Sequence, residues 1–541
     1  MKKVLLSGLC LFAFAVSAGP GSGMSFTNVK PAKNVILMIS DGTSLPVVTL
    51  TRWVYGGGPL AVDDLFCGYV RTYWAGGPIS DSAPAATAMA TGWKSWDKYI
   101  GMMPPRNLLP GIPPIPAGRS NAPAATILEA ARLKGLATGL VATSELMHAT
   151  PAAFASHALN RNNYSDIAEQ MVFNSVDVVL GGGSKFLKSS ERKDAEDLGA
   201  DLRTAGYSYI TNTAELRLWA GAEKQEKKIW ALTAPASLPA EVDRDPALQP
   251  SLAELTGLAL SSLSRKTDGF FLMVEGSQVD WHAHADDTVG LVREFKAFDD
   301  AVAAAVAFAK KNGETVVIVT ADHGNSGISI GRKETSYADA PLSEFVDVIR
   351  KAKGSAWKFK GLFTQARTNL RPLMKEYYGI TNLTGSEMTN LQNAKDDQVF
   401  GLVNSIVALR ANIGYTTWGH TGEDVMLGVY SPGRDRPEGL IQNTDITRYM
   451  EQVLGLDLEA ATGSLYRDAF PAFLAKGADV RSDLSQPADP VLVARKGKNT
   501  LRLPVNKNVA YLDDRMIMLD GVTVFNGDRW FVCSQALGLL P

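Results

Sequence analysis

The chain has 541 residues, of which 45% are hydrophobic and 20% are charged, as in ordinary folded proteins. This composition excludes collagen-like, coiled-coil and wholly disordered chains. The 54 Lys and Arg residues nearly balance the 56 Asp and Glu residues, so the net charge of −2 gives no reason to expect nucleic acid or an anionic membrane as a partner.

The first 18 residues have the pattern of a cleavable secretory leader. Two lysines precede an apolar run, residues 4–16, and small residues follow it up to Ala18. The run is shorter than the roughly 20 residues that span a bilayer, so we expect cleavage rather than a membrane anchor. The mature protein is then periplasmic or secreted. Cys67 and Cys533 remain, too few for a disulfide framework, and the sequence leaves open whether they pair.

Short apolar runs in the rest of the chain predict buried strands. Most are rich in Val, Ile or Leu, as in strands that are covered on both faces. They lie at residues 35–39, 139–142, 176–180, 270–274, 316–319 and 425–430. Stretches with helical spacing lie between them, at residues 125–134, 164–172 and 288–310. This alternation predicts an α/β fold with a mainly parallel central sheet and helices on both faces.

Two regions depart from this pattern. Residues 331–412 contain charged helical stretches without a clear strand, which indicates an insertion. From residue 482 to 541, alternating segments are separated by Asp-Gly and Asn-Gly turns, which indicates a small C-terminal β-rich module. The main domain is therefore expected to span residues 19–481.

Chemically active side chains follow three of the predicted strands. Asp41, Glu275 and the pair Asp322-His323 each come directly after an apolar run. In an open α/β sheet, ligands bind beyond the carboxyl ends of the strands. A single aspartate at such a position is more often a turn former or a helix cap. The three positions together indicate a ligand site.

The histidines and their neighbours favour metal binding. Asp280 and His284 are four residues apart, so a helix would place both on one face and within reach of one ion. Asp41, Asp322 and His323 can build a second site. Imidazole with carboxylate suits zinc, whereas carboxylate and hydroxyl alone suit magnesium. Two neighbouring cations fit a mechanism in which metals hold the attacking and the leaving oxygen of an in-line displacement.

A nucleophile is available at Ser82. Asp81 and Pro84 mark the start of a helix, and the Ala-rich sequence that follows permits close packing. Ser82 would lie at the positive end of this helix, where a phosphate or an alkoxide is favoured. A serine in this position can also act as a simple helix cap, but the predicted metal ligands favour the nucleophile.

Together these motifs resemble those of the alkaline phosphatases. They occur in the family's order between residue 34 and about residue 460: Asp41-Gly42, Asp81-Ser82-Ala83, His148-Ala-Thr150-Pro151 with Arg161 downstream, Glu275-Gly-Ser-Gln-Val-Asp280 with His284, Thr320-Ala-Asp322-His323-Gly324 and Gly419-His420-Thr421-Gly422. The resemblance implies an alkaline phosphatase-like catalytic domain over residues 19–481. It also implies that residues 331–412 form a lid-like or crown-like insertion.

The resemblance further implies two Zn²⁺ and one Mg²⁺ per chain. Each ion would have its own set of ligands. One zinc would be held by Asp280, His284 and His420. The other zinc would be held by Asp41, Asp322 and His323, with Ser82 joining as the nucleophile. The magnesium would be held by Asp41, Thr150 and Glu275.

Three further residues receive roles from the same resemblance. Arg161 would bind two phosphate oxygens with its planar fork, which a lysine does less well. His148 and Trp281 stand where the best-studied bacterial members carry Asp and Lys. Both are therefore expected behind the metal ligands rather than among them, and product binding is expected to be weaker without the lysine.

The activity that the resemblance implies is hydrolysis of small-molecule phosphate monoesters at alkaline pH, with broad specificity, through a phosphoserine on Ser82. The family also implies a homodimer. Two alternatives remain open: a phosphodiesterase or sulfatase with the same two-metal core, and a secreted protein that binds metal or phosphate without turnover. Glu275 and Thr150 disfavour the diesterase, and a Cys/Ser-x-Pro-x-Arg pattern typical of sulfatases does not occur around Ser82. Retention of both Ser82 and Arg161 disfavours the binding protein.

Overall fold

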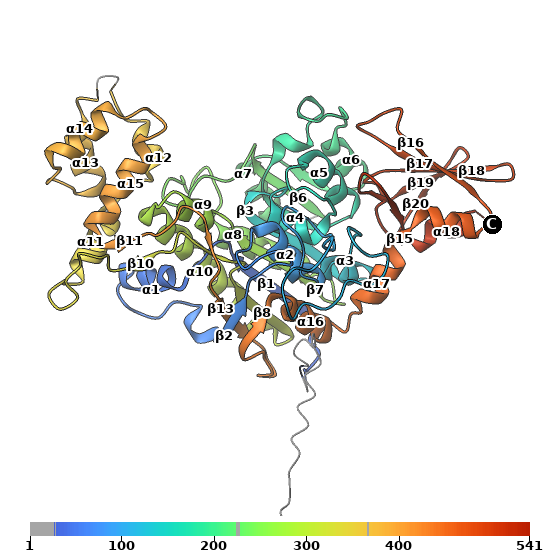
Figure 1. The fold of residues 1–541 in the computed structure, drawn as a ribbon, viewed down its shortest axis with the longest axis horizontal. Helices are drawn as coiled ribbons and strands as arrows, with labels where there is room; N and C mark the ends of the chain where they lie inside the picture. The colour runs from blue at the N-terminus through green and yellow to red at the C-terminus, as the bar shows by residue number, and fades with distance from the viewer. Residues whose placement is uncertain (1–25, 27–28, 223–227, 365–366, 541) are drawn as a thin grey trace, which may run out of the picture.

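The computed structural model describes residues 26, 29–222, 228–364 and 367–540. The predicted leader at residues 1–18 lies outside them. Within the described residues, a sheet of ten strands forms the centre of the molecule (Figure 1). From one edge to the other, its strands are β14 (Gly439–Gln442), β2 (Phe66–Arg71), β13 (Val425–Tyr430), β8 (Thr315–Thr320), β1 (Asn34–Ser40), β7 (Phe270–Gly276), β3 (Ala137–Glu145), β4 (Val178–Gly182), β6 (Ile229–Ala234) and β5 (Ser208–Ile210).

The sheet is mainly parallel, as the apolar runs predict. Strand β1 pairs in parallel with β7 on one side and β8 on the other, and all seven of its residues are buried. Its side chains alternate between two hydrophobic cores: Ile36 and Met38 belong to one, and Val35, Leu37 and Ile39 to the other. Both faces are therefore covered, which explains why this strand is a continuous apolar run rather than an alternating one.

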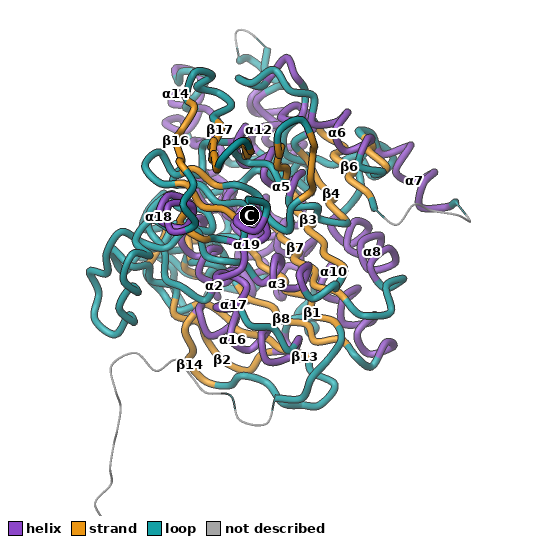
Figure 2. The backbone as a smooth tube through the Cα atoms, turned by 90° about the vertical axis from the view of Figure 1, so that its right-hand side faces the viewer, coloured by secondary structure: helices purple, strands orange, loops and turns teal. Residues whose placement is uncertain are grey.

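Helices on each face supply these cores. The core on the Ile36 side receives residues of α1 (Leu45–Val54), α8 (Leu252–Leu263) and α10 (Thr288–Asn312). The core on the Val35 side receives residues of α2 (Ser82–Thr91), α3 (Ile127–Leu133), α4 (Ala149–Ala155), α5 (Tyr164–Phe173) and α16 (Asn443–Leu454). Figure 2 shows the strands between α8 and α10 on one side and α2 and α3 on the other. The prediction of helices on both faces is confirmed.

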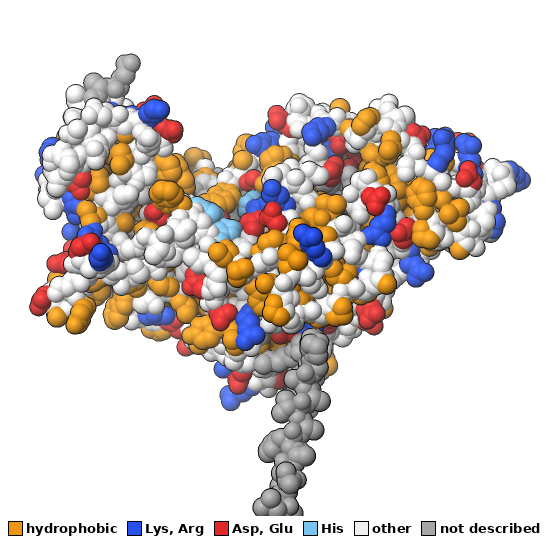
Figure 3. Space-filling view, viewed as in Figure 1, with side chains coloured by type: hydrophobic (Ala, Val, Ile, Leu, Met, Phe, Trp, Pro, Cys, Tyr) orange, Lys and Arg blue, Asp and Glu red, His pale blue; other side chains and the backbone are white. Residues whose placement is uncertain are grey.

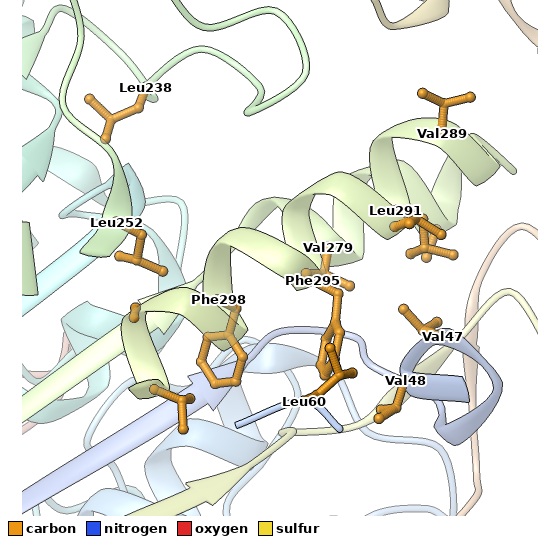
Figure 4. Packing of buried hydrophobic residues seen from close by; sticks show 14 of the residues in the cluster. Val47, Val48, Leu60, Leu238, Leu252, Val279, Val289, Leu291, Phe295 and Phe298 are labelled. Carbon is orange, nitrogen blue, oxygen red and sulfur yellow. The ribbon is translucent and has the colours of Figure 1, made fainter. Parts of the chain in front are cut away.

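Helix α10 shows how the spacing of the sequence becomes packing. Its apolar residues recur every three or four positions, so they form one buried stripe. In Figure 4, Leu291, Phe295 and Phe298 lie along one side of this helix, and Phe295 points toward Leu60. The helix ends at Gly313, which adopts a left-handed conformation with φ of 75°.

Four strands of the sheet are not indicated by the sequence. Strands β5 and β14 have only three and four residues. Strand β2 alternates exposed and buried side chains, and β6 contains Trp230 and two alanines rather than a run of Val and Ile. One further detail escapes the sequence: β13 runs antiparallel to both of its neighbours, β2 and β8.

The described residues of the predicted insertion contain five helices. These are α11 (Ser343–Lys351), α12 (Ala356–Lys360), α13 (Leu370–Tyr378), α14 (Gly385–Asn393) and α15 (Val399–Arg410). Strands β10 (Ser329–Ile330) and β11 (Ile413–Gly414) pair immediately outside residues 331–412. The pair brings both ends of the segment together, so its helices project from one side of the molecule (Figure 1). Below, the described residues of 331–412 are called the helical insertion.

The C-terminal region forms a separate small sheet at the opposite end of the molecule (Figure 1). Its five antiparallel strands are β16 (Asp479–Asp483), β17 (Val491–Lys496), β18 (Asn499–Pro504), β19 (Val509–Leu512) and β20 (Arg515–Met518). The first strand begins three residues before the predicted start of the module at residue 482. A third hydrophobic core under this sheet also includes Ala469 and Phe473 of α18 (Ala469–Ala475).

Polar contacts fasten this sheet to the main body. Lys507 forms ion pairs with Glu169 and Glu196, and Asn506 donates a hydrogen bond to Glu169 Oε2 at 3.0 Å. Lys507 supplies positive charge to the carboxylates of Glu169 and Glu196. We therefore assign these carboxylates to the contact between the two parts rather than to a cation site. Cys533 lies buried in the C-terminal core and is free, as is the partly buried Cys67. They do not form the disulfide that the sequence left open.

Lys94 is a buried amine and makes stability depend on pH. Its Nζ donates to the carbonyl oxygen of Tyr73 at 2.7 Å, and burial lowers its pKa to about 7. Between about pH 7 and 10.5 the unfolded chain therefore binds more protons at this residue, and stability rises with pH. We expect Lys94→Met to remove a rise on the order of 3–5 kcal/mol in unfolding free energy between pH 7 and 10.5. Denaturant unfolding at both pH values measures it, and profiles of wild type and variant that run parallel would contradict it.

Among the described residues, no helix combines the length and the apolar character that a membrane crossing requires.

Candidate active site

The predicted ligands meet beyond the carboxyl ends of three central strands of the sheet. Asp41 follows β1, Glu275 lies near the end of β7, and Asp322 and His323 follow β8. These three strands are neighbours and parallel, so their carboxyl ends lie side by side. His420 arrives from the other direction, because it pairs with Asn325 just before the antiparallel strand β13 begins. Asp41 and His420, at opposite ends of the family motifs in the chain, thus share one site.

The first ligand group consists of Asp280, His284 and His420. Asp280 and His284 lie on one face of the short helix α9 (Gln278–His284), with His284 Nε2 3.4 Å from Asp280 Oδ2. His420 Nε2 lies 3.4 Å from Asp280 Oδ1 and 3.0 Å from His284 Nε2. The i, i+4 spacing therefore brings the two α9 residues together as predicted.

The hydrogen bonds of the two imidazoles show that this group suits a cation. His284 Nδ1 lies 2.6 Å from the carbonyl oxygen of Trp418, and His420 Nδ1 lies 2.8 Å from that of Ser80. A carbonyl only accepts, so each Nδ1 carries a proton and each neutral ring has its lone pair on Nε2. The two Nε2 atoms lie 3.0 Å apart beside the carboxylate of Asp280, whose hydrogen bonds raise the pKa of both rings, that of His420 to about 9. A divalent cation between them would satisfy all three side chains.

The second ligand group consists of Asp41, Asp322 and His323, all fully or almost fully buried. His323 Nε2 lies 3.3 Å from Asp322 Oδ2 and 3.5 Å from Asp41 Oδ1. Gly42 allows the close approach of the two groups: its amide donates to Asp322 Oδ1 at 3.0 Å, and a Cβ there would lie 2.5 Å from Asp280 Oδ1. Its φ of 63° also suits glycine.

A third group of donors lies behind Asp41. Asp41 Oδ2, Thr150 Oγ1 and Glu275 Oε1 are buried, and they make no hydrogen bond with any described residue. Buried oxygens without partners are costly, and these three are the ones that the family resemblance assigns to magnesium. Their all-oxygen character fits such an ion.

The pKa values of two buried carboxylates, Asp41 and Glu275, show the same need for positive charge. Burial, followed by the nearby carboxylates of Asp322, Asp280 and Glu275, raises the pKa of Asp41 well above its usual range. Burial also raises the pKa of Glu275 to about 7. Burial and mutual repulsion make it unfavourable for neighbouring carboxylates to ionise. Bound cations would favour the ionised form and so lower these pKa values.

Ser82 lies at the junction of these groups. It is the first residue of α2, and its Oγ lies 3.3 Å from His323 Nε2 and 3.5 Å from Asp41 Oδ1. Its side chain is buried, and its neighbours on α2 are buried alanines that pack closely. The hydroxyl therefore adjoins the second ligand group, at the N-terminal end of a helix whose partial positive charge favours an anion.

Arg161 is held in place by two neighbours. Its Nη1 contacts both carboxylate oxygens of Asp81 at 2.7 Å, and its Nη2 donates to His148 Nε2 at 2.8 Å. Asp81 does begin helix α2, but its carboxylate binds Arg161 instead of capping the helix. Sequence analysis treated Asp81 only as a helix start and missed this role. Its position directly before Ser82 was the available signal.

His148 lies beside the third group but is a poor ligand in this arrangement. Burial and the neighbouring Arg161 lower its pKa to about 3, so the ring is neutral. A guanidinium can only donate, so Nε2 accepts and the proton sits on Nδ1, which has no partner among the described residues. The ring also makes an edge-on contact with Trp281. His148 nevertheless lies within reach of one ion together with Asp41 and Glu275, so the place of His148 and Trp281 behind the ligands stays a prediction.

The sequence patterns did not indicate two other residues that contact the candidate ligands. The amide of Asn325 donates to Asp280 Oδ1 at 2.7 Å and orients that carboxylate. Trp418 holds His284 through its backbone carbonyl, which no sequence pattern could indicate. His282, between two candidate ligands, instead contacts Asp287 Oδ2 at 3.0 Å and is fully buried away from the site.

Comparison with known proteins gives a consistent result. A family model described as alkaline phosphatase matches residues 32–456. The chain is 35% identical to alkaline phosphatase 3 of Bacillus subtilis over 453 residues, which cover 80% of this chain and 91% of that relative. It is 28% identical to the alkaline phosphatase of Escherichia coli, covering 79% and 87% of the two chains.

Solved structures show the same relationship. The crystal structure of an alkaline phosphatase from Shewanella sp. has 28% identity and a TM-score of 0.67, and the match covers 78% of this chain and 99% of that one. That of Thermus thermophilus alkaline phosphatase has 26% identity and a TM-score of 0.68, with 80% and 94% covered. A histidine-to-glutamate mutant of the TAB5 alkaline phosphatase, with 26% identity, 79% and 99% covered and a TM-score of 0.56, has Mg bound in its M3 site.

Proposed function

The chain belongs to the alkaline phosphatase family, and from this membership we propose that it is a secreted enzyme that hydrolyses a broad range of phosphate monoesters through a phosphoserine on Ser82. One observation carries the proposal. The nucleophile, the arginine and two groups of metal ligands converge at one edge of the sheet, with Ser82 Oγ within 3.5 Å of the second group. This arrangement has the parts of a metal-assisted displacement at phosphorus.

We propose two Zn²⁺ and one Mg²⁺ as the bound ions. The two histidine-containing groups have the donors that zinc prefers, and the Asp41, Thr150 and Glu275 oxygens have those of magnesium. When bound, such cations lower the pKa of a nearby hydroxyl and stabilise charge on the attacking and departing oxygens. The tautomers of His284 and His420, fixed by Trp418 and Ser80, are the ones that ligation requires.

The chain's own residues account for the rest of the chemistry. Arg161, oriented by Asp81, would bind two oxygens of the phosphate and hold it against Ser82. Ser82 loses its hydroxyl proton, attacks phosphorus, and displaces an alcohol that takes up a proton. Water then cleaves the phosphoserine and releases inorganic phosphate. Since the phosphate group supplies most of these contacts, a broad range of leaving alcohols is expected.

Two further proposals concern the whole protein. Residues 1–18 would direct export to the periplasm or the medium and then be removed, which rests on their sequence alone. A homodimer rests on the family alone.

The test is steady-state hydrolysis by the wild-type enzyme of an aryl phosphate monoester, the matching diester and the matching sulfate at alkaline pH. Each assay is run with and without a chelator, and bound metal is measured on the same samples. The proposal predicts that monoester turnover dominates and is lost with the metal. Faster turnover of the diester or the sulfate would overturn the substrate class. Metal or phosphate binding without turnover would show a binding protein instead.

A further inference from the structure

A cavity of about 640 Å³ lies between the first ligand group and the helical insertion. On one side it is lined by His284, Ala285 and Asp286, at the end of α9. Trp418 adjoins these residues, because its carbonyl oxygen lies 2.6 Å from His284 Nδ1, and the other side of the cavity is formed by α14 and by the start of α15. In Figure 3, histidine side chains are visible at the surface in the hollow between the helical insertion and the main body. The volume is in the range of small-molecule sites.

The position of Ser82 assigns this cavity to one side of the reaction. Ser82 Oγ adjoins the second ligand group, 3.3 Å from His323 Nε2. In an in-line displacement the departing oxygen lies opposite the attacking one. A phosphate held between the two groups therefore directs its leaving alcohol toward the first group. His284 belongs to that group, its side chain is 40% exposed, and it lines the cavity.

Trp418 provides a flat apolar surface in this cavity. It is 78% exposed, although its backbone carbonyl is fixed by the hydrogen bond from His284 Nδ1. An anchored backbone with a large exposed indole is unusual for a residue without a ligand, because most tryptophans bury their rings. Phe400 adds a second ring, which is stacked on Trp357 at 5.6 Å and so is held in place. Exposed aromatic faces suit the face of another flat ring.

The rest of the lining combines small apolar residues with polar side chains. The amide side chains of Asn390, Asn393 and Gln398 line the wall that belongs to the helical insertion. Asp286 lies on the opposite wall, and its Oδ1 has no partner among the described residues. The described lining residues include no lysine or arginine. Amides that both donate and accept suit the edge of a heterocyclic ring, whereas a further anionic group would meet only a carboxylate.

The insertion is fastened to the helix that carries the metal ligands, so the cavity has a defined shape. Asn404 on α15 donates a hydrogen bond to the carbonyl of Ala285 at 2.8 Å. Tyr415, just before Trp418, shares a 2.9 Å hydrogen bond with Thr288 at the start of α10. Both contacts join the insertion or its flanking loop to the residues that directly follow His284.

We propose that this cavity binds the leaving group and favours phosphate monoesters of uncharged alcohols that carry a flat heterocycle, namely nucleoside 5′-monophosphates. The base stacks on Trp418, and the amides of the insertion contact its edge. Trp418 is thus a substrate-contact residue that sets specificity, and the insertion forms part of the substrate site. The inference rests on the proposed phosphomonoesterase function and adds a preferred substrate class to it.

The experiment compares kcat/KM for adenosine 5′-monophosphate and for ribose 5-phosphate. In both substrates the departing oxygen is the primary 5-hydroxyl oxygen of a ribose, and only adenosine 5′-monophosphate carries a base, so the ratio isolates the contribution of the base. For the wild-type enzyme we expect a ratio of about 10 or more, since stacking of a base on an aromatic side chain is worth roughly tenfold. Trp418→Ala should bring the ratio close to 1, and Trp418→Phe should retain most of it. Asn390→Ala combined with Asn393→Ala should lower it several-fold.

Trp53→Ala is the matched control, because this tryptophan is 44% exposed on α1 and does not line the cavity. It should leave the ratio unchanged. A wild-type ratio near 1, or an equal loss on both substrates in Trp418→Ala, would overturn the proposal while the proposed function stands. Hydrolysis of neither substrate, nor of an aryl phosphate, would overturn both.

Discussion

Replacing Ser82 with alanine is expected to lower kcat for an aryl phosphate by at least about 10³-fold. The hydroxyl is the atom that forms the bond to phosphorus, and the described residues within 3.5 Å of it are candidate metal ligands that cannot take over this role. Acid quenching during turnover should trap a phosphoryl group on Ser82 in the wild type only. Mass spectrometry of the peptide that contains residue 82 measures this directly.

Two measurements separate a lost nucleophile from a damaged site. Bound metal in Ser82→Ala should equal that of the wild type, because Asp41, Asp322 and His323 all remain to hold an ion at the second group. Ser262→Ala is the matched control: Ser262 is also a buried helical serine, on α8 and outside the site. Wild-type turnover in Ser82→Ala, or a trapped phosphoryl group on another residue, would refute the phosphoserine mechanism.

Replacing Asp41 with asparagine is expected to have a comparably large effect for a different reason. Asp41 contributes to both the second and the third ligand group, so one substitution removes a carboxylate from two candidate sites. We expect activity to fall by at least about 10³-fold and bound metal to fall by more than one ion per chain. Metal analysis after dialysis, beside the steady-state assay, provides both quantities.

The stability of Asp41→Asn offers an independent check. Burial and the neighbouring carboxylates raise the pKa of Asp41, so its charge opposes folding when no cation is present. In a chelator, the variant should therefore be at least as stable as the wild type, whereas with added metal it should be less stable. Asp300→Asn, an exposed carboxylate on α10, is the control and should change neither. Full metal content in Asp41→Asn would contradict its place in two sites.

Local patterns in the sequence were sufficient for the centre of the fold. Continuous apolar runs such as residues 35–39 need no partner information to be recognised, because a strand covered on both faces must be apolar at every position. The four-residue spacing of Asp280 and His284 likewise determines their shared helix face. The rule that ligands lie at the carboxyl ends of parallel strands then placed Asp41, Glu275 and Asp322 at one edge.

Short or partly exposed strands were not predicted, because their residues do not have to be apolar at every position. Strand β2 has exposed residues on one face, and β6 mixes alanine with tryptophan, so neither has a distinctive period. The binding partner of Asp81 was also missed. A carboxylate before a helix caps it in many proteins, and only the position of Arg161, 80 residues away, shows that this one does not.

The sequence by itself determined the α/β class, the candidate nucleophile and the residue types available as ligands, because these follow from spacing along the chain. The tertiary structure decided which donor atoms face one another, which hydrogen bonds fix the histidine tautomers, and how Trp418 and three amides of the helical insertion come to lie near His284. These are relations between segments that lie far apart in the chain. They depend on how helices and strands pack, and packing is set by the whole molecule rather than by any one stretch of residues.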